Sequence, residues 1–284
     1  MRFLAFLLLP LFLITCNSPE PGPVNIATFN IRYDNPADSL NAWPNRKEMV
    51  VKAIRDNDFD LFGMQEVLHR QLEYLESNLD GFERVGIGRL GGTWGEYAPI
   101  FFKTDCFEKM ADSTIWLSET PTVIASVGWD AALPRIATWV KLKDKQSGKF
   151  LSVFNTHFDH IGVMARQESV KLMLTFVGSL REDIPTIIMG DFNIPEGDTP
   201  YQLLANKEQN SMGFTDSKYS SKSAHEGPTG TFNGFSDEVS RKEAIDFIFI
   251  NERIATRTHA TLEIREGPVF VSDHYPVMIS VDLK

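Results

Sequence analysis

Hydrophobic residues are grouped in short blocks along most of the chain, and their spacing predicts both strands and helices. Alternating and β-branched blocks predict strands at residues 24–31, 59–64, 82–88, 96–103, 107–116, 135–143, 150–156, 186–189, 244–250 and 277–283. Apolar residues at helical spacing predict helices near Asn45, Leu68 and Val163, and a short helix at residues 199–205. Asn45 is the expected N-cap of the first helix, because Glu48 follows three residues later.

The block at residues 186–189 is followed by Gly190, and Asp191 and Asn193 come directly after it. Alternate side chains of an extended segment face the same way, so these two polar groups can point into one cleft at the end of a sheet. Ligands often bind at such strand ends. A loop aspartate that caps the next turn would give the same pattern. The role of Asp191 therefore depends on which other polar groups reach this edge.

Several other predicted strands also end in polar side chains. These residues are Asn30, Glu66, His157, Asp246, Asp273 and His274. Taken singly, most of them fit an ordinary turn or edge position. Asp246 is different, because it lies inside the apolar run 245–250, and a buried carboxylate without a partner is strongly destabilising.

The order of these residues along the chain resembles a known family. The motifs are Thr28-Phe29-Asn30, Gln65-Glu66, Asn155-Thr156-His157, Gly190-Asp191-Phe192-Asn193, Ile245-Asp246-Phe247 and Ser272-Asp273-His274. In this order they resemble the endonuclease/exonuclease/phosphatase superfamily, which includes DNase I-like nucleases, inositol polyphosphate phosphatases and neutral sphingomyelinases. The resemblance covers nearly all of residues 24–284. It implies a DNase I-like α/β fold, a four-layer α/β/β/α sandwich, and metal-dependent hydrolysis of phosphoester bonds by water.

The acids in this set predict a metal ion. Four carboxylates do not share one cleft without a cation or protonation. Ligation by oxygen without sulfur indicates Mg²⁺ or Mn²⁺ rather than a structural zinc ion. We expect Glu66 to be the first metal ligand with help from Asn30, and Asp273 to bind the same ion or a second one. The ion would polarise a phosphoryl oxygen.

The resemblance also implies roles for the catalytic residues. Asp191 would orient the attacking water, and Asn193 would donate a hydrogen bond to the phosphate. His274 would act as a base or as a donor to the transition state, with Asp246 as its orienting carboxylate. His157 would bind phosphate or protonate the leaving oxygen.

Two further residues are candidates for the same site. Glu96 is the expected partner of His157, because residues 96–102 resemble the DNase I-like segment that supplies such an acid. Arg135 is a candidate for phosphate contact, and a surface arginine on a strand is an equal alternative.

The sequence leaves the substrate open among nucleic acid, a phospholipid head group and a small phosphorylated molecule. Lipid hydrolysis would predict an exposed apolar hairpin near the site, which we do not identify in the sequence. Nucleic-acid hydrolysis would predict basic residues around the cleft, and the chain offers only four in a mixed-charge loop: Lys218, Lys222, Arg241 and Lys242. Phe232 could stack on a base or sugar, or simply lie under its own loop. A non-catalytic binding lipoprotein is the rival class, and the intact set of acids and histidines argues against it.

The N-terminus predicts export. The chain has 284 residues and is 43% hydrophobic, which suits one large domain. Residues 1–15 contain a short apolar run behind Arg2, typical of a signal peptide. Leu13-Ile14-Thr15-Cys16 resembles a bacterial lipobox, and an ordinary signal peptide is the alternative. We expect a lipid anchor on Cys16 in the bacterial cell envelope, a tether at residues 16–23, and a phosphoesterase domain at residues 24–284.

Net charge and cysteine count argue against tight DNA binding and against a disulfide. Loss of residues 1–15 removes one positive charge, that of Arg2, so the formal net charge changes from −10 to −11. Such an acidic domain does not attract long polyanions through its general field, which argues against tight non-specific DNA binding. With lipid on Cys16, Cys106 is the only other cysteine, so no intrachain disulfide can form. No obligate protein partner is expected.

Overall fold

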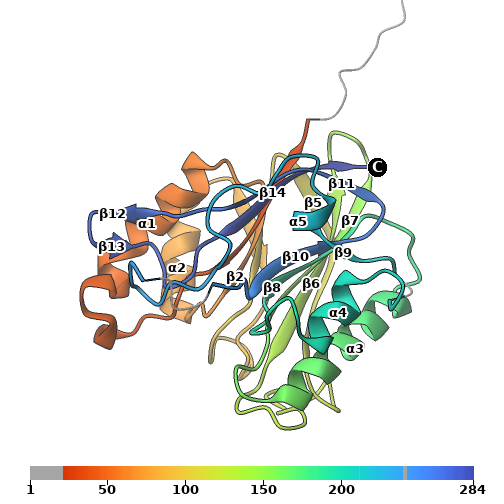
Figure 1. Ribbon diagram of the computed structural model, residues 1–284, viewed down its shortest axis with the longest axis horizontal. Coiled ribbons are helices and arrows are strands. Elements are labelled where there is room, and N and C mark those ends of the chain that lie inside the picture. Colours follow the sequence, from red (N-terminus) through yellow and green to blue (C-terminus); the bar gives the residue numbers. More distant parts are fainter. Residues whose placement is uncertain (1–21, 211, 239–241) are drawn as a thin grey trace, which may run out of the picture.

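Two six-stranded sheets form the centre of the protein (Figure 1). The computed structural model describes residues 22–210, 212–238 and 242–284. The first sheet contains, in spatial order, β11 (Ile254–Thr261), β14 (Val277–Leu283), β1 (Val24–Asn30), β2 (Leu61–Gln65), β4 (Ile100–Lys103) and β3 (Phe82–Val85). The second contains β5 (Phe107–Trp116), β6 (Ile136–Asp144), β7 (Phe150–His157), β8 (Thr186–Asp191), β10 (Asp246–Ile250) and β9 (Thr215–Asp216). A separate small hairpin pairs β12 (Arg265–Glu266) with β13 (Val269–Phe270).

Helices cover the outer faces of both sheets, which gives four layers in the order α/β/β/α (Figure 1). The first sheet is covered by α1 (Trp43–Asp56) and α2 (His69–Asn78), and the second by α3 (Val163–Ser179) and α4 (Thr199–Ala205). Two short helical segments lie in the connections, η1 (Pro36–Asn41) and α5 (Ser217–Ser220). The DNase I-like four-layer fold expected from the sequence is therefore confirmed.

Three hydrophobic clusters fill the spaces between the layers. The central cluster joins the inner faces of the two sheets, with Leu61 and Val153 among its members. Their neighbours Phe62 and Phe154 point the other way, into the clusters under the helices. Both faces of the central strands are therefore buried, which explains why the sequence blocks are apolar throughout rather than strictly alternating.

The strand register brings the polar strand ends to one edge of the two sheets. In the first sheet, β1 and β2 run parallel and Asn30 lies opposite Gln65. In the second sheet, β7 and β8 run parallel and His157 lies opposite Asp191, while the antiparallel β10 sets Asp246 opposite the same aspartate. The carboxyl ends of parallel strands meet at the same edge, so these residues are close in space although they are far apart in sequence.

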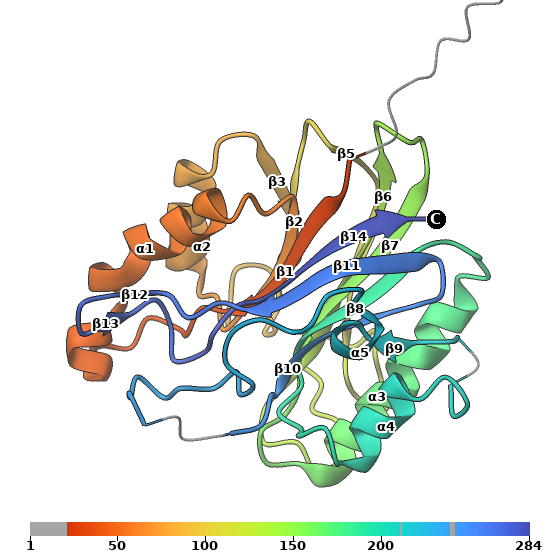
Figure 2. The same cartoon turned by 45° about the horizontal axis from the view of Figure 1, so that its top comes forward.

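The described chain begins at the other end of the sheets. Val24 pairs with Val281, and the first residues lie close to the C-terminus in both views (Figures 1 and 2). The expected signal peptide at residues 1–15 and the expected lipid site at Cys16 lie outside the described residues. In the part of the chain that the structure describes, no helix combines the length and apolar character needed to cross a membrane.

Several element boundaries differ from the sequence-based expectation, and two of them are instructive. The first helix begins at Trp43, so Asn45 lies inside it and is not the N-cap. Pro44 explains the earlier start, because proline fits the first helical turn, where its missing N–H is not needed. The expected strand 96–103 pairs regularly only from Ile100 onward, and before it Tyr97 makes isolated bridges to Val67 and Gly88.

Candidate active site

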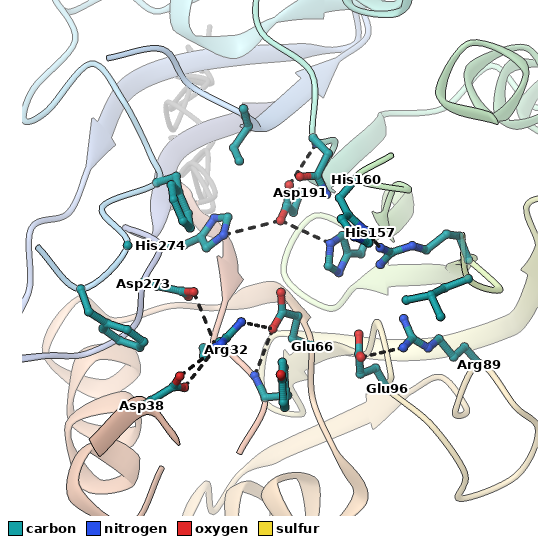
Figure 3. Close-up of a pocket in the computed structure, with 18 residues that line it drawn as sticks. Arg32, Asp38, Glu66, Arg89, Glu96, His157, His160, Asp191, Asp273 and His274 are labelled. Atoms are coloured by element: carbon teal, nitrogen blue, oxygen red, sulfur yellow. Dashed lines mark hydrogen bonds and ion pairs between the residues drawn. The ribbon is translucent and has the colours of Figure 1, made fainter. Parts of the chain in front are cut away.

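Asp191 lies in a pocket of about 700 Å³ at the edge where the strands end (Figure 3). Its side chain is almost fully buried. Its Oδ2 atom is 3.0 Å from the amide nitrogen of Asn30, 3.5 Å from Nε2 of His157 and 3.7 Å from Nε2 of His274. Side chains from β1, from β7 and from the segment before β14 therefore converge on one carboxylate oxygen.

The environment of Asp191 makes it a stronger base than an ordinary aspartate. Burial raises its pKa to about 7, and the neighbouring carboxylate of Asp246 adds to this shift. The charge of His274 and the hydrogen bond from Asn30 act in the opposite direction without cancelling it. A carboxylate with a pKa near neutrality can accept a proton from a bound water, as general-base catalysis requires.

Asn193 follows Asp191 in a strained turn. Its φ of 52° is in the left-handed region, which is uncommon for residues other than glycine. Its backbone N–H donates to Oδ1 of Asp191 at 3.0 Å, and its side-chain amide donates to the Phe158 carbonyl at 3.1 Å. Asn193 also lines the pocket, so the second hydrogen of its amide can meet a ligand.

His274 and Asp246 form a buried pair beside Asp191. Nδ1 of His274 donates to Oδ2 of Asp246 at 2.9 Å, and the hydroxyl of Thr231 donates to the same oxygen at 2.6 Å. Burial alone would lower the pKa of His274, but the charges of Asp246 and Asp191 raise it to about 10. His274 is therefore an imidazolium at neutral pH and a hydrogen-bond donor at both ring nitrogens.

The loop that supplies Thr231 also holds the His274 segment. The backbone N–H groups of Asn233 and Gly234 donate to the Asp273 carbonyl at 2.8 and 3.1 Å. The ring of Phe232 packs edge-on against His274, with 5.0 Å between ring centroids, and also lines the pocket. This aromatic residue is therefore part of the site's wall.

His157 faces Asp191 as a neutral imidazole. Burial and the positive charge of Arg135 lower its pKa well below the ordinary value. Its Nδ1 atom is buried and has no hydrogen-bond partner among the described residues, so its single proton is best placed on Nε2, toward Asp191. A cavity of about 10 Å³ lined by His157, Glu96 and Arg135 lies alongside and has room for one water.

Glu96 does not pair directly with His157, contrary to the expectation from sequence. Its carboxylate accepts a hydrogen bond from Arg89 at 2.7 Å (Figure 3). Burial raises the pKa of Glu96, and the charge of Arg89 acts in the opposite direction. Arg89 was not expected from the sequence, because this pair forms across the turn 88–96, and no periodicity predicts which way a turn arginine points.

Arg135 is buried rather than exposed on a strand, which excludes the surface alternative. Its Nε donates to Asp159 at 3.3 Å, and one terminal nitrogen lies 3.0 Å from Nδ1 of His160. Burial would raise the pKa of Asp159, but the N–H groups of Gly162 and Ile161 lower it to about 2, so it remains ionised. Arg135 and His160 both line the pocket.

Asn30 connects two carboxylates through its amide nitrogen. Its amide nitrogen donates to Asp191 and, at 3.2 Å, to Glu66, while its amide oxygen accepts the N–H of Arg32 at 3.0 Å. The reversed amide would set its oxygen against two carboxylates and its nitrogen against an N–H, so the network fixes the orientation. The amide oxygen keeps a second lone pair, and the metal contact of Asn30 stays a prediction.

Glu66 and Asp273 flank Arg32, another residue that the sequence analysis missed (Figure 3). Guanidinium nitrogens of Arg32 lie 3.8 Å from Glu66 and 3.7 Å from Asp273, and two of them bond to Asp38 at 3.1 Å each. Burial alone would lower the pKa of Arg32, but these three acids raise it above its ordinary value. Arg32 lies two residues beyond the end of β1 and has a φ of 56°, so the same-face spacing of an extended strand could not identify it.

Comparison with known proteins places this site in a family. The model of the Endonuclease/Exonuclease/phosphatase family matches residues 27–274. The chain belongs to this family. The superfamily membership expected from the order of the motifs is therefore confirmed.

Solved structures of this family are similar over nearly the whole chain. An endonuclease/exonuclease/phosphatase from Bacteroides vulgatus has 38% sequence identity and a TM-score of 0.87, with 93% of this chain and 100% of that chain covered. The mannosyl-6-phosphatase of Bacteroides thetaiotaomicron has 33% identity and a TM-score of 0.85, with 92% and 100% covered. An uncharacterised protein of Acanthamoeba polyphaga mimivirus is 28% identical over 164 residues, which are 55% of this chain and 60% of the viral protein. Together these findings support phosphoester hydrolysis in general.

The donor set of this family member fits a divalent cation. Two positive charges, on Arg32 and His274, face four carboxylates: Glu66, Asp191, Asp246 and Asp273. One buried oxygen of Asp246 has no hydrogen-bond partner among the described residues, and ligand atoms of Asp191, Asp246 and His274 lie within 4.8 Å of one another. Glu66 has a φ of 60°, a strained conformation that turns its carboxylate into the pocket. Excess acid of this kind is stabilised by a bound cation, and enzymes of this family typically depend on a divalent metal ion.

Proposed function

We propose that the protein is a metal-dependent phosphatase that removes the phosphate group from small phosphorylated sugars. The observation that carries this proposal is the charge pattern of the pocket wall. No lysine of the described residues lines the pocket, and each of its three arginines is paired with a carboxylate: Arg32 with Asp38, Arg89 with Glu96, and Arg135 with Asp159. Isolated, paired cations suit one compact phosphate group.

A nucleic-acid substrate is the less favoured alternative. Binding of a polynucleotide requires a row of cations along its backbone. Lys218 is paired with Glu196 at 2.7 Å, and Lys222 lies 3.8 Å from Asp282, so these two loop lysines face other acids. Arg241 lies outside the described residues. The similarity to a mannosyl-6-phosphatase over 92% of the chain supports the sugar class instead.

The pKa shifts divide the catalytic roles. Asp191, with a pKa near neutrality, would accept a proton from the attacking water. His274 is charged at neutral pH, which favours the role of donor to the phosphoryl oxygens over the role of base. Asn193 would donate a further hydrogen bond to the same phosphate, and the neutral His157 would donate one from Nε2, its single protonated nitrogen, which lies 3.5 Å from Asp191. Arg135, held in place by Asp159, would offer its remaining N–H groups to it.

Glu66 and Asp273 would hold the metal ion, with Mg²⁺ or Mn²⁺ as the candidates that suit oxygen ligands. Bound there, the ion would supply positive charge next to a phosphoryl oxygen. Arg32 lies between the two carboxylates and would keep them apart and oriented.

We further propose that the protein is exported and anchored by lipid on Cys16. The support is the signal-like run at residues 1–15 and the lipobox-like sequence that ends it. A lipid-anchored phosphatase would act on phosphorylated sugars outside the cytoplasm.

An assay panel tests the proposed function. It contains mannose 6-phosphate, glucose 6-phosphate, a phosphodiester, plasmid DNA, RNA and sphingomyelin, each with Mg²⁺, Mn²⁺ or EDTA. We expect sugar phosphates to be hydrolysed fastest, EDTA to abolish turnover, and His274→Ala to lower kcat by about 10²–10³. Met110→Ala, an exposed change on β5, is the control. Faster cleavage of DNA or of the diester would contradict the sugar assignment, and binding of sugar phosphate without turnover would favour the non-catalytic alternative.

A further inference from the structure

Exposed hydrophobic side chains gather beside the mouth of the pocket. Thirteen large hydrophobic side chains of the described residues are exposed, and ten of them lie in three segments, 87–94, 123–133 and 161–164. The other three of these thirteen described side chains are Leu40, Met110 and Tyr219. Each of the three segments adjoins residues that line the pocket: Arg89 and Glu96, Leu133 and Arg135, and His157 and His160. Each of the three segments therefore leads directly into the wall of the pocket.

Trp94 is the most exposed of these side chains, with 74% of its surface accessible. It stands on a turn that backbone hydrogen bonds hold closed, from Gly88 to Gly92 at 2.9 Å and from Trp94 to Gly91 at 3.1 Å. A Cβ atom on Gly88 would lie 2.1 Å from the Trp94 carbonyl oxygen, so only glycine fits there. A rigid turn that leaves an indole in water forgoes the stabilisation that its burial would bring. Such an arrangement is typical of a surface that binds a ligand.

A neighbouring segment packs against this turn. A Cβ atom on Gly91 would lie 2.8 Å from Cγ2 of Ile124, so Ile124 covers the turn at this point. The indole N–H of Trp116 donates to the Arg89 carbonyl at 2.8 Å and ties the base of the turn to β5. We call Leu90, Trp94 and Ile124 the Trp94 rim.

The charge around the Trp94 rim indicates a neutral ligand. Residues 86–96 contain one basic residue, Arg89, which is paired with Glu96 in the pocket, and residues 118–134 contain none. Membrane-binding loops and helices usually add lysine or arginine beside their apolar residues, because these attract anionic head groups. A sugar ring needs no such charge, because its C–H face packs on the flat face of an indole while its hydroxyl groups stay in water.

We propose that the Trp94 rim binds the unphosphorylated sugar residues of a phosphorylated oligosaccharide whose terminal phosphate lies at Asp191. This inference rests on the proposed function and extends it, because it makes the preferred substrate longer than a monosaccharide phosphate. The chain of sugars would leave the pocket past Leu133, which lines the wall and is 37% exposed. Trp94 would then act on substrate affinity and not on the chemical step.

Kinetics on two substrates test this proposal. The substrates are mannose 6-phosphate and a mannose trisaccharide that carries the same phosphate on its terminal residue. For the trisaccharide we expect Trp94→Ala to raise KM about tenfold with kcat within twofold, and Trp94→Phe to retain most of the affinity. KM for the monosaccharide should stay within twofold in all variants. Met110→Ala removes an exposed apolar side chain that does not line the pocket, and it should leave KM and kcat unchanged for both substrates.

A binding measurement separates this proposal from the proposed function. Calorimetry with the unphosphorylated trisaccharide should detect weak binding to the protein that Trp94→Ala abolishes, whether or not any sugar phosphate is hydrolysed. Equal KM changes for both sugar phosphates, or binding that does not depend on Trp94, would overturn the inference. Trp94-dependent binding to phosphatidylcholine vesicles, with unchanged trisaccharide kinetics, would overturn it too and assign the rim to a lipid surface.

Discussion

The charge of His274 depends on one buried carboxylate, and this dependence gives a test of the site at the scale of single residues. Burial lowers the pKa of His274, whereas Asp246 and Asp191 raise it to about 10. In Asp246→Asn the shape is kept but one of the two opposing charges is lost, so the pKa of His274 should fall. The imidazolium would then deprotonate at a lower pH, and the alkaline limb of the kcat profile should shift downward with it.

We expect Asp246→Asn to lower kcat by about 10²–10⁴ at pH 7.5. An NMR titration of the His274 ring measures the pKa directly and does not depend on turnover. Asp144→Asn is the control, because Asp144 is also a buried aspartate but is the last residue of β6 and does not line the pocket. It should leave kcat and the pKa of His274 unchanged. A titration of His274 near pH 10 in the Asp246→Asn protein would refute the assigned pairing.

The residues that could be found from sequence are those that end a strand. Asp191 and His157 follow apolar blocks, and the parallel register of β7 and β8 then brings them together. Arg89 and Thr231 could not be found this way, because their positions depend on turns whose course the hydrophobic pattern does not encode. The orientation of Asn30 was missed for a related reason, since two of the three hydrogen-bond partners that decide it, Glu66 and Asp191, come from distant segments.

At the scale of elements, β7 and β8 approach closely at Gly190. Its φ is 151°, and a Cβ atom there would lie 2.1 Å from the Thr156 carbonyl oxygen. Gly190→Ala should therefore push the two strands apart next to Asp191. We expect it to lower the free energy of unfolding by about 3 kcal/mol or more and to lower kcat as well.

Gly197→Ala provides the matched control for this change. A Cβ atom on Gly197 would meet nothing within 4 Å, so the free energy of unfolding should change by about 0.5 kcal/mol or less. Urea denaturation of the two variants measures the difference. Equal stability of both would show that the strands can move apart at Gly190 without cost.

The strands differ from one another in how clearly the sequence predicts them. Fully buried strands such as β8 and β10 stand out as apolar runs between polar turns. β11 was missed, because its buried positions include Thr256, His259 and Thr261, so that no apolar run marks it. Its strand conformation comes from antiparallel pairing with β14, a contact that the local sequence does not reveal.

At the scale of the whole molecule, the catalytic edge and the start of the described chain lie at opposite ends of the sheets (Figures 1 and 2). The seven residues of β1 alone separate the two ends by about 20 Å. A tether of residues 16–23 would reach about 28 Å when fully extended. A lipid on Cys16 would attach the domain at the end of the sheets opposite the pocket, which favours access of soluble substrates over lipids of the same membrane.

Attachment to vesicles by two different points tests this orientation. Residues 22–284 attached by an N-terminal polyhistidine tag to nickel-chelating lipid should hydrolyse soluble sugar phosphate within about twofold of the free rate, because the mouth stays open to solvent. The comparison protein carries Cys106→Ser and Thr93→Cys and is attached through the new thiol, next to Trp94, to a maleimide lipid. This attachment presses the mouth against the bilayer and should lower kcat/KM about fivefold or more, while the unattached comparison protein keeps the free rate. Equal loss of activity in both attached proteins would mean that the N-terminal end also brings the pocket to the membrane, and a lipid substrate would then become the better explanation of the apolar rim.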